Sequence, residues 1–248
     1  MRHRSLLALD KALIKCDACP RLVEWREEVA LTKRKSYQDE RYWGRPVPGF
    51  GSIAPKILVV GLAPGAHGAN RTGRIFTGDS SGDWLYRSLH HNGLAKIATS
   101  TDRNDGQELF ETRITCAVHC VPPGNKPSIE ERNQCSGWFT GELELVYPSL
   151  RVVVALGAFA WDSVVRSLKV KFGITEFTDS KGKIERNPRF SHGAEFVWLH
   201  PAGNSDGNKR VLLGSYHPSQ QNTFTGKLTE AMLNRVFARA VDLGLKPL

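Results

Sequence analysis

The chain has 248 residues, of which 40% are hydrophobic and 24% charged, a balance that is ordinary for a soluble globular protein. No apolar stretch is long enough to span a membrane, and residues 6–14 make a poor signal-peptide core because Asp10 and Lys11 interrupt them. We therefore expect a cytoplasmic protein with reduced thiols. The net charge of +9 favours a polyanionic partner such as nucleic acid.

In chain order, residues 1–50 are predicted to form a helical and coil extension rich in basic and aromatic residues. Apolar runs then predict strands at 57–60, 114–118, 151–156 and 210–214. Helical spacing predicts helices at 83–94, 128–145, 158–168 and 226–243, with Ser128 as the cap of the second. Residues 171–209 are polar, with one further strand predicted at 196–199. This alternation indicates one α/β domain whose mostly parallel sheet is covered on both faces.

The first strand runs into a glycine-rich loop that ends at Asp79. Such a loop usually brings backbone N–H groups close to a phosphate or a flat polar ligand. It also carries an amide, two cations and an aromatic ring, which are Asn70, Arg71, Arg74 and Phe76. The alternative is an ordinary connection between a strand and a helix.

All four predicted strands end in glycine, proline or polar residues. The segments after the strands are 61–79, 119–125, 156–158 and 215–222. Ligands of open parallel sheets bind outside the carboxyl ends of the strands. We therefore expect a cleft at this edge.

Five cysteines form a second group of interest. Cys16 and Cys19 have the spacing of a metal-chelating pair, Cys120 follows the second strand, and Cys135 lies in the next helix. Four such thiolates suit either zinc or a four-iron, four-sulfur cluster, and spacing does not separate the two. Cys116 lies inside an apolar strand and is expected to be a small buried residue. The alternative for the whole set is reduced thiols without a metal.

Six segments of this chain resemble family 5 uracil-DNA glycosylases, the iron–sulfur type also called B type. They are CDACPRLVEWREEV, RYWGRPVPGFG, GLAPGAHGANRTGRIFTGD, HCVPPGNKP, RVVVALG and SYHPSQQNT. The resemblance implies a single-domain, three-layer α/β/α fold over residues 1–248, with a small, mainly parallel four-stranded sheet. It also implies excision of uracil, and of other deaminated bases such as hypoxanthine and xanthine, from double-stranded DNA.

The resemblance also implies roles for individual residues. Cys16, Cys19, Cys120 and Cys135 would hold a four-iron, four-sulfur cluster, with zinc as the alternative, so residues 1–50 would supply two of its ligands. The catalytic residues would be Asp79, Asn125 and His217. Contacts to the flipped base would come from Gly61, Ala63, Phe76, Asn125 and His217. Ile75 stands where related sequences usually have proline, and Ala63 is normal for the family but rules out water activation from that position.

DNA contacts are expected from Arg71 and Arg74 and from a polar segment that would enter the minor groove, Ser219, Gln220, Gln221 and Asn222. Plainer roles stay open at this stage. Asp79 would serve as a helix cap, His217 as a strand-end residue, Asn125 as a turn residue and the segment after His217 as a polar loop. The basic residues Lys33, Arg34, Lys35, Arg41 and Arg45 form either a phosphate track or a solvated face. The alternative function is a non-catalytic iron–sulfur or zinc protein that binds nucleic acid, and we expect a monomer that acts at the nucleoid.

Overall fold

A computed structural model describes residues 3–199 and 209–246 of the chain. Within these residues the strands form a single eight-stranded mixed sheet in the order β1-β3-β2-β4-β8-β7-β5-β6. The strands are β1 (Phe50–Gly51), β2 (Ile57–Gly61), β3 (Thr112–Cys116), β4 (Val152–Leu156), β5 (Phe177–Asp179), β6 (Ile184–Glu185), β7 (Glu195–Leu199) and β8 (Lys209–Ser215).

The four predicted strands are the parallel centre of this sheet, where β3, β2, β4 and β8 lie side by side. The sheet is larger than the four strands that the resemblance implied, because β1 pairs antiparallel at one edge and β7, β5 and β6 extend the other. Strand β7 confirms the further strand predicted at 196–199. β1, β5 and β6 have only two or three residues each. Strands this short carry no readable alternation, and pairing with a neighbour defines them.

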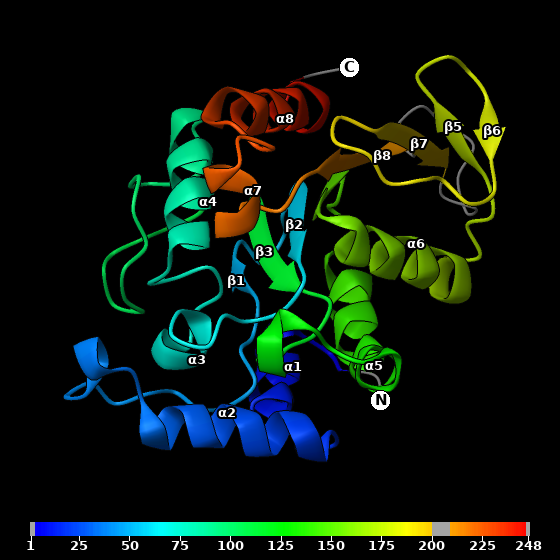
Figure 1. Ribbon diagram of the computed structural model, residues 1–248. Coiled ribbons are helices and arrows are strands. Elements are labelled where there is room, and N and C mark those ends of the chain that lie inside the picture. The colour runs from blue at the N-terminus through cyan, green and yellow to red at the C-terminus, as the bar shows by residue number, and fades with distance from the viewer. Residues whose placement is uncertain (1–2, 200–208, 247–248) are drawn as a thin grey trace.

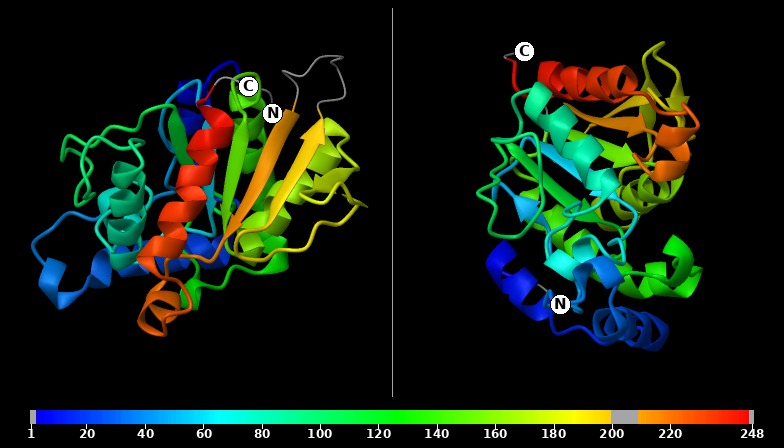
Figure 2. Two further views of the ribbon diagram at one scale, coloured as in Figure 1. Left: turned by 90° about the horizontal axis from the view of Figure 1, so that it is seen from above. Right: turned by 60° about the vertical axis from the view of Figure 1, so that its left-hand side comes forward.

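Helices cover both faces of the sheet, as the alternating pattern predicted (Figures 1 and 2). Side chains of β2 alternate between two cores: Ile57 and Val59 pack with α4 and α8, whereas Leu58 and Val60 pack with α5 and α6. The helices are α1 (Leu6–Leu13), α2 (Pro20–Thr32), α3 (Ala69–Thr72), α4 (Ser80–His91), α5 (Ile129–Val146), α6 (Ala158–Phe172), α7 (Gln220–Phe224) and α8 (Glu230–Gly244). Two short 3-10 helices, η1 (Lys35–Tyr37) and η2 (Pro123–Asn125), complete the fold.

Helix starts follow their capping residues. Ser128 caps α5 in a reciprocal capping box with Glu131, as predicted for Ser128. Thr229 caps α8, which therefore begins four residues later than the apolar spacing indicated. Asp79 caps α4, which begins at Ser80 rather than at Asp83.

In Figure 1 the N-terminal helix α2 lies below α3 and α1 lies to the right of α3, where α1 packs against α5. A buried ion pair lies at this contact, because Arg113 Nε donates to Glu142 Oε1 of α5 at 2.5 Å. Asp10 Oδ2 of α1 lies 3.6 Å from Arg113 Nη2. Burial raises the pKa of Asp10 to about 6. No helix among the described residues is both long and apolar enough to cross a membrane.

Candidate active site and cysteine cavity

Phe76 lies in the glycine-rich loop between β2 and α4, with its ring packed beside His217. The two ring centroids are 5.6 Å apart and the rings are tilted by 32°. Phe76 has a backbone φ of +51°, a left-handed conformation that is uncommon for an aromatic residue. A Cβ on Gly61 would lie 2.7 Å from the Phe76 ring and 3.0 Å from Cys116 Sγ. Gly61 is therefore the residue that admits the Phe76 ring at the end of β2.

Asp79 is the N-cap of α4, and its Oδ1 accepts a hydrogen bond from Gly82 N at 2.9 Å. The helix-capping role is thus present, and the backbone N–H groups of Gly82 and Ser81 both act on this carboxylate. The other oxygen, Oδ2, faces Gly65 and Gly68, where a Cβ would lie 2.8 Å and 1.9 Å away. Burial raises the pKa of Asp79 above its ordinary value of 3.8, against the hydrogen bond from Gly82, which lowers it.

His217 follows β8 and lies beside the end of β4, where a Cβ on Gly157 would be 3.5 Å from His217 Cβ. Asn222 Nδ2 donates to the His217 carbonyl oxygen at 2.9 Å and fixes the turn. Burial lowers the pKa of His217 to about 4. The imidazole is therefore neutral at pH 7, so one ring nitrogen carries a hydrogen and can donate it.

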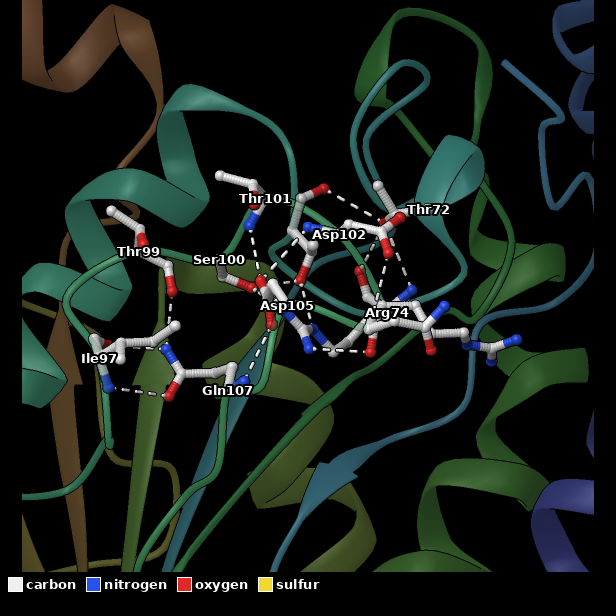
Figure 3. A network of polar contacts seen from close by, with 12 residues as sticks. Thr72, Arg74, Ile97, Thr99, Ser100, Thr101, Asp102, Asp105 and Gln107 are labelled. Carbon is white, nitrogen blue, oxygen red and sulfur yellow. Dashed lines mark hydrogen bonds and ion pairs between the residues drawn. The ribbon is translucent and has the colours of Figure 1, made fainter.

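Arg74 braces the glycine-rich loop from inside (Figure 3). Its guanidinium donates to Thr77 Oγ1 at 3.0 Å, to Ser100 Oγ at 2.7 Å and to Asp105 Oδ2 at 2.5 Å. Burial raises the pKa of Asp105, but the bonds from Arg74 and from three backbone N–H groups outweigh it and hold that pKa below the ordinary value. The glycine-rich loop is thus held by the ion pair between Arg74 and Asp105, whose side chains are largely shielded from water.

Arg71 is also used within the chain. It pairs with Glu40, donates to the Gly78 carbonyl oxygen at 3.1 Å and stacks over the Tyr37 ring. Arg71 and Arg74 are only 8% and 4% exposed. The guanidinium groups of both arginines thus have partners inside the protein, and their contact with DNA stays a prediction.

Of the other predicted site residues, Asn125 ends η2 on an exposed turn with a φ of +58°. No contact among the described residues joins it to Asp79, Phe76 or His217, so its part in the site stays a prediction. The segment after His217 forms the short helix α7 rather than a loop, with Ser219 as its N-cap and exposed Gln220 and Gln221 in its first turn.

All four cysteines of the predicted ligand set line one cavity. Cys16 and Cys19 precede α2, Cys120 follows β3, and Cys135 lies on α5. The other residues that line this cavity are mostly apolar and include Leu13, Leu22, Pro46 and Trp138. Ala63, predicted to contact the base, lies in the glycine-rich loop and packs against an apolar group that includes Leu22 and Cys135 of this cavity.

Two donors point at the sulfur atoms: Arg26 Nη1 at 3.2 Å from Cys120 Sγ, and the His119 N–H at 3.4 Å from Cys135 Sγ. Arg26 is buried, and its Nε has no hydrogen-bond partner in the described structure. Burial raises the pKa of Cys120 to about 11 and also raises that of Cys135. Such thiols become thiolates only beside positive charge. The donor set, the buried cation and the apolar wall therefore fit an anionic metal–thiolate group.

The four thiols do not converge on one point. No group of three or more His, Cys, Asp or Glu side chains within residues 3–199 and 209–246 is arranged to hold a single metal ion. The contacts of Arg26 and His119 with the cysteine sulfur atoms were not predicted from the sequence. Neither has a spacing signal, because their role depends on how α2 and the end of β3 meet.

The Uracil DNA glycosylase superfamily model matches residues 48–240, so the chain belongs to this superfamily of hydrolytic N-glycosylases that act on DNA. The α/β fold, with parallel strands at the centre of a mixed sheet, agrees with that assignment.

Within the superfamily, the chain groups with the type-5 enzymes, as the motifs indicated. It is 50% identical over 239 residues to the Type-5 uracil-DNA glycosylase of Mycobacterium leprae (strain TN), which covers 96% of both chains. It is 46% identical over 236 residues to that of Thermus thermophilus, covering 95% of this chain and 97% of the relative. The Type-4 uracil-DNA glycosylase of Thermotoga maritima is 29% identical over 174 residues, covering 70% and 69%.

Proposed function

We propose that this protein hydrolyses the N-glycosidic bond of uracil in double-stranded DNA and leaves an abasic site. Hypoxanthine and xanthine are further proposed substrates. The observation that carries the proposal is the placement of a partly free Asp79 carboxylate three residues after Phe76, whose ring packs beside the neutral imidazole of His217.

The base must first leave the helix, since the glycosidic bond of a stacked nucleotide is out of reach. Unstacking costs a few kcal/mol, least at a mismatch such as uracil opposite guanine. The Phe76 ring offers a replacement stacking surface, and such a stack is worth about 1–3 kcal/mol. Gly61 keeps the end of β2 free of a side chain where that ring lies.

Bond cleavage then leaves the electron pair on the base nitrogen and an oxocarbenium-like sugar. A ring N–H of His217 would donate to a base carbonyl oxygen as negative charge grows there, and burial keeps the ring neutral for this task. Asp79 Oδ2 would face the cationic sugar and orient a water for attack at C1′. The proton released by that water would pass to the carboxylate or to the departing base. Asn125 is proposed to hold a base edge when DNA is bound.

Cys16, Cys19, Cys120 and Cys135 are proposed to hold a four-iron, four-sulfur cluster. The four thiols around one cavity, the buried Arg26 beside them and the apolar lining support an anionic metal–thiolate group, and the resemblance favours the cluster over zinc. Arg26 would balance its charge, and bound there it would brace α2 against α5. Purified protein is expected to carry about four iron atoms per chain with the visible absorption of such clusters. A colourless protein with one zinc would refute this.

The test of function uses an end-labelled duplex with one uracil opposite guanine, followed by alkali to cut abasic sites. Asp79→Asn keeps the helix cap but removes the charge, since Asn caps as well as Asp. We expect it to lose base release by a factor of about 10² or more while duplex binding persists. Asp83→Asn, at the exposed neighbouring carboxylate, is the matched control and should excise normally. Unchanged excision in the Asp79 variant would remove it from the mechanism.

A further inference from the structure

A second polar cavity lies between α5 and α6, on the face of the sheet opposite α4 and α8. It measures about 130 Å³, and one water needs only about 10–15 Å³. The cavity is therefore large enough for a small polar group. Its polar lining comes from two arginines, one amide and four hydroxyl groups: Arg132, Arg166, Asn133, Ser136, Thr140, Ser163 and Ser167.

The two arginines of this cavity are the unusual feature. Arg132 Nε is buried without a hydrogen-bond partner. Within residues 3–199 and 209–246, the side chains of Arg132 and Arg166 make neither a hydrogen bond nor an ion pair, whereas those of Arg74 and Arg113 are paired with carboxylates. Arg132 instead lies 5.9 Å from the Phe159 ring centroid. Arg132 is half-buried and Arg166 is exposed, so the donor that lacks a partner in a buried place is Arg132 Nε. A buried N–H group without an acceptor is costly, so an acceptor bound in the cavity would be stabilised there.

The hydroxyl groups are mostly engaged, which limits what the cavity can bind. Ser136 donates to the Asn133 carbonyl oxygen and Ser163 to that of Phe159. Thr140 and Ser167 share one hydrogen bond at 3.0 Å, which leaves one hydroxyl hydrogen free. The free donors are therefore this hydroxyl, the Asn133 amide and the two guanidinium groups.

The local charge is positive. Asp162 of α6 is the carboxylate that acts on Arg132, and burial raises its pKa although Arg132 lowers it. One carboxylate against two guanidinium groups leaves an excess of at least one positive charge. Donors and positive charge together exclude a metal cation and select an oxyanion.

We infer that the α5–α6 cavity is a binding site for a phosphate group. Guanidinium groups bind phosphate through paired N–H donors, which suits two arginines around one cavity. Arg132 and Phe159 lie in the first turns of α5 and α6, which follow the carboxyl ends of β3 and β4. A phosphodiester of a bound duplex reaches this edge if the proposed function is correct, and a free phosphate is the other source of the same chemistry.

The experiment compares the full-length protein with an Arg132→Gln, Arg166→Gln double variant. A Lys181→Gln, Arg186→Gln variant removes the same charge from exposed positions near the β5–β6 hairpin and is the control. Asn133→Asp adds a carboxylate at an exposed position without removing an arginine. Thermal unfolding by circular dichroism confirms that each variant folds.

Two arms separate the sources of the phosphate. In the first, affinity for an undamaged duplex is measured against salt; loss of one or two phosphate contacts should make the slope of log K against log salt less negative by roughly 0.9 each. In the second, inorganic phosphate is titrated into the protein and followed by NMR at the arginine N–H signals.

If the slope of log K against log salt is less negative in the Arg132/Arg166 and Asn133 variants but not in the control, the site binds a phosphate of DNA. If phosphate shifts the NMR signals of the unaltered protein but not those of the Arg132/Arg166 and Asn133 variants, and the salt dependence of duplex binding is the same in all of them, the site binds free phosphate. Slopes and phosphate shifts equal to those of the control overturn the inference. Uracil release under single-turnover conditions with excess enzyme is measured in the unaltered protein and in the Lys181/Arg186 control, where it should be equal. Failure of the proposed function would abolish that release already in the unaltered protein, so the two failures are distinct.

Discussion

Gly68 tests how strictly the active site depends on space around Asp79. A Cβ at residue 68 would lie 1.9 Å from Asp79 Oδ2 and 2.6 Å from Cγ. Non-bonded heavy atoms attract at roughly 3.5 Å, so Gly68→Ala must move the carboxylate or the loop by more than 1 Å. A misplacement of that size costs about 10²-fold in rate, which is roughly 2.7 kcal/mol of transition-state stabilisation.

The assay is single-turnover release of uracil from a U·G duplex with excess enzyme. We expect Gly68→Ala to be about 100-fold slower while it still binds the duplex. Gly137→Ala in α5 is the control, because a Cβ there meets nothing within 4 Å. That control should excise uracil at the normal rate and gain a few tenths to about 1 kcal/mol in stability.

A double variant identifies the cause. If Gly68→Ala acts by displacing the carboxylate, it should cost almost nothing in a chain that already carries Asp79→Ala, because the two changes remove the same interaction. Additive losses would mean that Gly68 acts elsewhere in the loop. An excision rate within about threefold of the unaltered protein would refute the steric reasoning altogether.

Three further predictions concern the same region. Excision should fall as pH falls, with an apparent pKa above 3.8, because burial raises the pKa of Asp79 and the carboxylate is the active form; the residual rate of Asp79→Asn should lack this acid limb. His217→Gln keeps an N–H donor and should stay within about tenfold of the normal rate, whereas His217→Ala should lose about 10²–10³-fold; equal losses would exclude the donor role. Asn70→Ala removes the hydrogen bond from Asn70 Nδ2 to the Arg26 carbonyl oxygen and should lower the free energy of unfolding by about 1 kcal/mol in urea, and unchanged stability would show that this bond contributes nothing.

The parallel centre of the sheet was predictable because its strands are apolar runs buried on both faces. The same logic located the carboxyl edge, where Phe76 and His217 meet. Strands β5 and β6 were not predictable, since a two- or three-residue strand is defined by its neighbour and not by its own side chains.

Arg74 shows why a motif alone does not assign a role. In the sequence it is a cation in a glycine-rich loop, which favours a phosphate contact. In the fold, Ser100 and Asp105 come from a segment without apolar periodicity and take up that charge. The cavity between α5 and α6 escaped prediction for a related reason: its arginines and hydroxyls lie on two helix faces whose contact is set by packing.

The N-terminal extension is connected by hydrogen bonds to the glycine-rich loop of the candidate active site. Arg26 on α2 donates to Cys120 Sγ and to the Cys16 carbonyl oxygen, while its own carbonyl oxygen accepts from Asn70 in the glycine-rich loop. One buried residue thus connects the cysteine cavity to the loop that ends at Asp79. Hydrolysis of an N-glycosidic bond moves no net electrons, so we expect the group bound in the cavity to serve the reaction by holding α2 in place. A rigid α2 keeps the loop in register, which is the condition for placing the Asp79 carboxylate within the tolerance that the Gly68 experiment measures.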